Sequence, residues 1–150
     1  MQFVIELSDA KVRETIENLL VSAFEGGSNY WYMITGYTYP KGKTRKTMEA
    51  EKAQSAKDDF DKEFFPHIDT VLFGGGIKVH DTESANKGTV TLTYDKCVKA
   101  LKLMAECAGM PPEKRHTHPR HWEDVLNENT DADTGDVFLQ LALWGEVIYG

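Results

Sequence analysis

Residues Asp131 to Gly150 read DADTGDVFLQLALWGEVIYG, and this stretch decides how the chain folds. A cluster of acids runs directly into the segment Val137 to Trp144, which is apolar nearly all round except for Gln140. A helix without a polar face is buried on several sides, and an apolar chain end is ordered only when it is docked. We therefore expect a final helix, beginning near Asp131, that is built into the core or into a subunit contact.

The acids of this stretch, Asp131, Asp133 and Asp136, precede the expected helix or lie in its first turn. Carboxylates are favourable at the positive end of a helix dipole, and this effect alone explains most of them. Their spacing does not match that of a calcium-binding loop. Gln140 must be hydrogen-bonded in the core, or it faces a ligand or a subunit interface, because a buried amide needs partners.

In the segments that precede this helix, predicted strands dominate the first two-thirds of the chain and predicted helices the last third. Helical spacing of apolar residues predicts helices over residues 9–25, over Thr47–Phe64 and from Asp95 to Gly109, and Pro119 opens a short one. Short apolar runs predict strands at Phe3–Leu7, Ser28–Tyr39 (with a bulge at Gly36) and Asp69–Phe73, and a hairpin of Ile77–Asp81 with Thr89–Tyr94. The pattern predicts a single α+β domain, residues 1–150, in which a small, mostly antiparallel sheet packs against about four or five helices.

Composition limits the classes of function. The chain has 150 residues, a length that suits one domain, and its net charge of −7 argues against general nucleic-acid binding. No run approaches the length of a membrane span, and the N-terminus has neither the pattern of a signal peptide nor that of a transit peptide. Cys97 and Cys107 lie about 15 Å apart on one expected helix, too far for a disulfide. We therefore expect a cytoplasmic protein with reduced thiols.

The segment Glu25 to Tyr32, EGGSNYWY, is the strongest candidate for ligand contact. Its glycines allow close backbone approach, and Ser28 and Asn29 offer adaptable hydrogen bonds. The rings of Tyr30 and Trp31 could stack on a nucleobase or on a partner side chain. The alternative is a helix C-cap followed by a half-buried strand.

A basic loop follows the expected strand, with Lys41, Lys43, Arg45 and Lys46. Gly42-Lys43-Thr44 resembles the end of a P-loop, but Tyr37 stands where that pattern requires its first glycine, so we do not expect a Walker site. Lys43 or Arg45 could still hold a phosphate electrostatically. The alternative is a solvated loop.

Three histidines, His116, His118 and His121, lie within the motif HTHPRH and are weak candidates for zinc ligands. Arginines and a lysine beside them disfavour a cation, and the spacing matches no recognised ligand pattern. No nucleophile–base motif occurs in the chain. We expect neither a cofactor nor catalytic residues.

At EGGSNYWY and at DADTGDVFLQLALWGEVIYG the chain resembles a group of small, functionally undescribed proteins of tailed bacteriophages and prophages. The resemblance carries no catalytic assignment. It implies a virus-encoded accessory protein acting in the cytoplasm of a bacterial host. Such proteins often inhibit host defence, either by binding a defence protein or by sequestering a nucleotide signal.

Three functional hypotheses follow. The first is a non-catalytic anti-defence protein, expected to be a homo-oligomer, that sequesters a small nucleotide-type signal. Its expected ligand-binding residues are Glu25, Gly26, Gly27, Ser28, Asn29, Tyr30, Trp31, Lys43, Arg45 and Gln140. The second is a protein-binding inhibitor of a host defence or host metabolic protein, favoured by the net acidity. The third is a small hydrolytic or metal-dependent enzyme, based on the histidines and Glu25.

Overall fold

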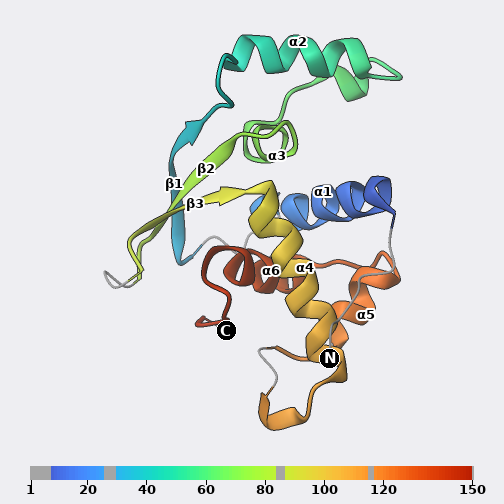
Figure 1. Cartoon of the computed structure of the whole chain (residues 1–150), viewed down its shortest axis with the longest axis vertical. Helices are drawn as coiled ribbons and strands as arrows, with labels where there is room; N and C mark the ends of the chain where they lie inside the picture. Colours follow the sequence, from blue (N-terminus) through green and yellow to red (C-terminus); the bar gives the residue numbers. More distant parts are fainter. Residues whose placement is uncertain (1–7, 26–29, 84–86, 115–116, 150) are drawn as a thin grey trace.

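The computed structural model describes residues 8–25, 30–83, 87–114 and 117–149 and shows one α+β domain (Figure 1). An antiparallel sheet of three strands stands on one side of a group of helices. The helices are α1 (Asp9–Glu25), α2 (Arg45–Ser55), α3 (Pro66–Leu72), α4 (Tyr94–Gly109), α5 (Arg120–Leu126) and α6 (Ala132–Trp144). Short 3-10 turns, η1 (Phe60–Lys62) and η2 (Pro112–Lys114), follow α2 and α4, and the strands are β1 (Tyr32–Thr38), β2 (Gly76–Asp81) and β3 (Thr89–Thr93).

The sheet has the order β1-β2-β3, so β1 and β3 are its edges. Ile77 and Val79 of β2 and Leu92 of β3 point into the core, whereas the opposite face carries Lys78 and several threonines. The register of β1 with β2 shifts between Ile34 and Gly36, which confirms the expected bulge. The hairpin of β2 and β3 is also confirmed.

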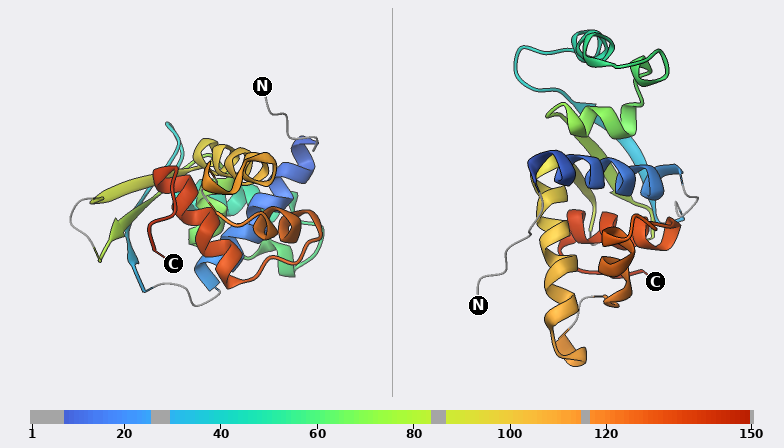
Figure 2. Two further views of the ribbon diagram at one scale, coloured as in Figure 1. Left: turned by 90° about the horizontal axis from the view of Figure 1, so that it is seen from below. Right: turned by 90° about the vertical axis from the view of Figure 1, so that its right-hand side faces the viewer.

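The helices cover one face of the sheet. The C-terminal helix α6 lies between α1 and α4 and reaches β3, and nearly every residue from Thr134 to Leu143 is buried (Figure 2). Asp131 caps its N-terminus by accepting a hydrogen bond from the Thr134 amide at 2.8 Å. The expected buried final helix is therefore confirmed. By contrast, α2 stands away from the main body at the far end of the molecule (Figure 2).

The crossing of α6 over α1 depends on one glycine. A Cβ atom built on Gly135 would lie 2.5 Å from the backbone nitrogen of Ala23 and 2.6 Å from the carbonyl carbon of Ser22. Only the absence of a side chain lets the two backbones approach so closely. This contact positions the first turn of α6 beside the C-terminal half of α1.

The strand expected at Asp69–Phe73 is wrong, because these residues belong to or end helix α3. Pro66 occupies its first turn, where its fixed φ favours helix and its missing N–H costs nothing. The Asp69 carboxylate accepts a hydrogen bond from the Phe65 amide at 2.6 Å and pairs with Lys52 at 2.7 Å. The short run DTVLF fits a strand or a buried helix equally well, and Pro66 was the signal that distinguishes them.

Other boundaries differ from expectation by smaller amounts. Helix α2 ends at Ser55 rather than continuing to Phe64, and Thr93, not Asp95, caps α4. Cys97 and Cys107 are both buried, free thiols on α4, as expected. The strand expected at residues 3–7 lies outside the described residues. None of the described helices combines the length and apolar character that crossing a membrane requires.

Candidate binding surface

Tyr30 and Trp31 lie against the C-terminal segment of the chain at one end of the sheet. Trp31, just before β1, donates a hydrogen bond from Nε1 to Oδ1 of Asp136 on α6 at 2.6 Å. The Trp31 ring stacks on Tyr149, with ring centroids 5.7 Å apart, and meets Trp144 at 4.9 Å. These contacts join residues more than 100 positions apart in the sequence.

Gln140 holds the C-terminal segment onto this cluster. Its side-chain oxygen accepts hydrogen bonds from the amides of Ile148 and Tyr149, each at 2.8 Å. Its amide nitrogen donates to the Tyr149 carbonyl and to Oδ2 of Asp136, each at 2.9 Å. Every donor and acceptor of the Gln140 head group is therefore used, as a fully buried amide requires.

This geometry changes the roles expected for two residues. The Trp31 side chain is 0% exposed, so it has no free face on which a base could stack. Gln140 is also 0% exposed and is fully occupied by the chain itself. Both residues build the core of this region, and Gln140 takes the first of the alternatives that its sequence position left open.

Tyr30 is the ring of this cluster that faces solvent. Its side chain is 56% exposed, and its ring meets Tyr149 edge-on at 6.5 Å. Partial burial and the nearby carboxylates of Asp136, Asp133 and Glu83 raise the pKa of Tyr30. We call the surface formed by Tyr30 and the half-buried Tyr149 the Tyr30 patch; the carboxylates of Glu83 and Asp133 act on it electrostatically, and Asp133 is also paired with Arg120.

The carboxylate beneath this patch is itself perturbed. Burial raises the pKa of Asp136, although hydrogen bonds from Trp31 and Gln140 act in the opposite direction. Burial, with the charges of Asp136 and Glu25, raises the pKa of Tyr32 to about 12. The electrostatic surroundings of the Tyr30 patch are therefore acidic, which favours a cationic partner and disfavours a phosphate.

The expected phosphate contacts lie elsewhere. Lys43 pairs with Glu51 at 2.9 Å, and Arg45 pairs with Glu49 one helical turn away at 2.9 Å. They follow the far end of β1, and that strand alone separates them from Trp31 by about 20 Å. The structure therefore does not bring the expected base-stacking and phosphate-binding residues together.

The remaining residues that were expected to bind a ligand do not lie together among the described residues. Gly26, Gly27, Ser28 and Asn29 lie outside the described residues. Glu25 ends α1 and lines a cleft of about 350 Å³ between α1 and α3, whose other charged residues include Lys52 and Asp69. In this cleft Lys52 is already paired with Asp69 and lies over the ring of Phe65.

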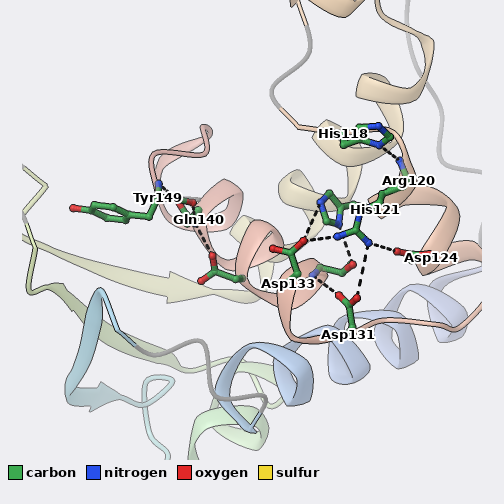
Figure 3. A network of polar contacts seen from close by, with 10 residues as sticks. His118, Arg120, His121, Asp124, Asp131, Asp133, Gln140 and Tyr149 are labelled. Carbon is green, nitrogen blue, oxygen red and sulfur yellow. Dashed lines mark hydrogen bonds and ion pairs between the residues drawn. The ribbon is translucent and has the colours of Figure 1, made fainter.

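A second polar network joins α5 to the start of α6 (Figure 3). The Arg120 guanidinium pairs with Asp124 at 3.0 Å, lies 3.9 Å from Asp131 and also pairs with Asp133. His121 is buried and shares a hydrogen bond with Oγ1 of Thr134 at 2.9 Å. The network ties the two helices together and accounts for the acids that open α6.

The histidines of the HTHPRH motif are separated by this network. The Nδ1 of His118 accepts a hydrogen bond from the Arg120 amide at 3.1 Å, whereas His121 points into the α5–α6 contact. His116 lies outside the described residues. Across the residues that the structure does describe, no three metal-ligating side chains lie together. Metal analysis of the purified protein tests the metal-dependent form of the enzyme hypothesis.

The half-buried imidazole of His67 and the buried imidazole of His121 lead to a prediction of how stability depends on pH. Burial lowers the pKa of His67 and, together with Arg120, that of His121. The unfolded chain therefore binds protons more readily, so stability is full above the ordinary histidine value of about 6.5 and falls as the pH drops below it. Denaturant titrations at several pH values should show this fall, with a slope of at most about 1.4 kcal/mol per pH unit for each imidazole. The slope should diminish in His121→Gln, and an unchanged slope in His67→Gln/His121→Gln would contradict this assignment.

A groove runs beside β1 on the side of the sheet that faces the helices. Its volume is about 490 Å³, and it is lined by β1 from Tyr32 to Tyr37, by Phe24 at the end of α1 and by His67 on α3. The Tyr37 hydroxyl and Nδ1 of His67 are hydrogen-bonded at 2.8 Å, and their rings stack at 5.8 Å. Sequence reasoning missed this groove, because His67 and Phe24 meet β1 only in the folded chain.

Comparison of the chain with models of protein families, with curated proteins and with solved structures finds no match. The functional assignment therefore depends on the geometry and charge of this surface.

Proposed function

We propose that the protein is a phage-encoded, non-catalytic accessory protein that acts in the bacterial cytoplasm by binding a host defence or metabolic protein. The Tyr30 patch carries this proposal, because an exposed tyrosine stands there among carboxylates. Exposed aromatic rings are frequent anchors of protein interfaces, and acids around them select a basic partner surface. The net charge of −7 acts in the same direction by steering the approach of a basic partner.

A protein partner fits this surface better than a nucleotide does. The phosphates of a nucleotide would be repelled by the carboxylate of Glu83, which acts on Tyr30, the exposed ring of the described cluster around Trp31. The two cations expected to hold them, Lys43 and Arg45, are ion-paired at the other end of β1. A basic protein surface gains from the same carboxylate.

The test is capture of host protein by the immobilised chain. Tyr30→Ala should lose at least about tenfold in affinity for the captured protein, because truncation of an aromatic anchor costs about 2 kcal/mol or more. Tyr39→Ala is the matched control, since Tyr39 is also exposed but follows the opposite end of β1 and should bind as wild type. Equal capture by both variants, or no host protein at all, would overturn the proposal.

The second candidate is sequestration of a nucleotide-type signal, and the exposed ring of Tyr30 is the observation that favours it. A base would stack on that ring. A nucleotide panel distinguishes the candidates: a thermal shift of several degrees that Tyr30→Ala abolishes would favour the nucleotide, because a ligand stabilises only the state that binds it.

A further inference from the structure

We infer that the partner is bound as an extended segment that adds a fourth strand to the free edge of β1. This inference rests on the proposed function and names its mode of recognition. The Tyr30 patch leads directly into β1, so one extended segment can contact both. Strand addition supplies main-chain hydrogen bonds for affinity and side-chain pockets for specificity.

The two edge strands of the sheet, β1 and β3, differ in how their outward-facing backbone groups are protected. At the β3 edge, Lys96 donates a hydrogen bond from Nζ to the Thr91 carbonyl at 2.6 Å, so a charged side chain occupies an edge acceptor. The β1 sequence YMITGYT contains no charged residue and no proline, two of the devices that protect an edge; a third device, a bulge, is present only between Ile34 and Gly36. Within the described parts of the chain, β1 pairs with β2 alone.

The hydrogen-bonding groups of β1 that face outward can be assigned. The Trp31 carbonyl accepts from the Thr82 amide at 2.8 Å, so the backbone of Trp31 faces β2. Because backbone groups in an antiparallel pair alternate between facing the partner and facing away, those of Tyr32 and Ile34 face the free edge. They offer two amide donors and two carbonyl acceptors to an added strand.

The groove beside this edge lies where the inward side chains of an added strand would go. Its walls are aromatic, with Phe24, Tyr37 and His67, and its volume of about 490 Å³ is sufficient for a few side chains. Since side chains alternate along a strand, the segment should carry apolar residues at every second position. Met33, which is 51% exposed, offers a further apolar contact to the added strand.

The charges near the groove indicate which kind of segment it binds. The charge of Glu25 acts on both His67 and Tyr32, that of Arg45 acts on Tyr37 at the other end of β1, and further carboxylates act on Tyr30. The segment should therefore carry lysine or arginine where it leaves the groove toward Tyr30. A second copy of this chain fits less well, because β1 supplies no positive charge and both copies carry a net charge of −7.

The test screens the immobilised protein with a displayed library of random dodecapeptides. We expect enriched peptides that combine alternating apolar residues with lysine or arginine. A synthetic peptide of this type should slow hydrogen exchange of the Tyr32 and Ile34 amides by at least about tenfold. Thr35→Lys places a charge on the exposed bulge of β1 and should weaken binding by at least about tenfold, whereas Thr89→Lys on the exposed face of β3 should not.

Three results would overturn the inference: no enriched peptide, a bound peptide that leaves the β1 amides unprotected, or equal effects of Thr35→Lys and Thr89→Lys. A dimer in sedimentation that Thr35→Lys converts to monomer would overturn it in favour of a second copy. If Thr35→Lys still captures the host protein and Tyr30→Ala does not, the strand addition fails while the proposed function stands. If peptides protect β1 but no host protein is captured, the proposed function fails instead.

Discussion

Replacing Gly135 by alanine is expected to lower the free energy of unfolding by about 2–3 kcal/mol, the usual cost of overpacking a close contact. The added Cβ would lie 2.5–2.6 Å from backbone atoms of Ser22 and Ala23, and backbone cannot turn aside as a flexible side chain can. The helices α1 and α6 must then separate along their contact. Denaturant unfolding measured by circular dichroism is the appropriate readout.

The matched control for this substitution is Gly109→Ala at the end of α4. A Cβ atom there meets nothing within 4 Å, so the variant should be neutral or slightly more stable, because alanine is the better helix former. If Gly135→Ala were as stable as Gly109→Ala, the close approach of α6 to α1 would be incorrect.

Replacing Gln140 by leucine is expected to destabilise the protein by about 2–4 kcal/mol and to release the C-terminal segment. Leucine is similar in size, so the loss comes from hydrogen bonds rather than from a cavity. The variant removes the two bonds to the amides of Ile148 and Tyr149, the bond to the Tyr149 carbonyl and one of the bonds to buried Asp136. Release of Tyr149 should unstack it from Trp31 and change the tryptophan fluorescence.

Tyr149→Phe separates the side chain of Tyr149 from the backbone that Gln140 holds. It removes only the hydroxyl that donates to Asp81 at 2.9–3.0 Å and leaves the hydrogen bonds of Gln140 in place. We therefore expect a smaller loss, about 1 kcal/mol, with rapid hydrogen exchange at Ile148 in Gln140→Leu only. Slow exchange at Ile148 in Gln140→Leu would show that another contact docks the segment.

The same variants connect stability to binding, because the C-terminal segment supports the Tyr30 patch. Tyr149 contacts the ring of Tyr30 and is held by Gln140. Gln140→Leu should therefore weaken partner binding as well as folding, whereas Gly135→Ala should affect binding only through the fraction of folded protein.

Much of the fold could be predicted from local patterns. The apolar run Val137 to Leu143 requires burial wherever it is placed, and Asp131 caps a helix through contacts within one turn. The hairpin of β2 and β3 is likewise local. The strand predicted at Asp69–Phe73 was wrong because a short apolar run suits strand and helix alike, and these residues belong to or end a helix that packs against α1 and β2.

The arrangement of the candidate site, by contrast, could not be predicted from local patterns. Sequence reasoning offered both Tyr30 and Trp31 as exposed stacking rings, but Trp31 is buried, because its surroundings include Asp136 and Tyr149 from more than 100 residues away. It also joined Lys43 and Arg45 to these rings, although an extended strand carries them to the other end of the sheet.

The sequence by itself determined that this chain forms a helix from Asp131 onward and buries it, because helix capping and apolar periodicity act over a few residues. Only the tertiary structure decided that Gln140 holds Ile148 and Tyr149, that Gly135 lets α1 and α6 meet, and that β1, which pairs with β2 alone among the described residues, lies beside a groove. Those features depend on which distant segments pack together. That choice is made by the burial of the whole core rather than by any local preference.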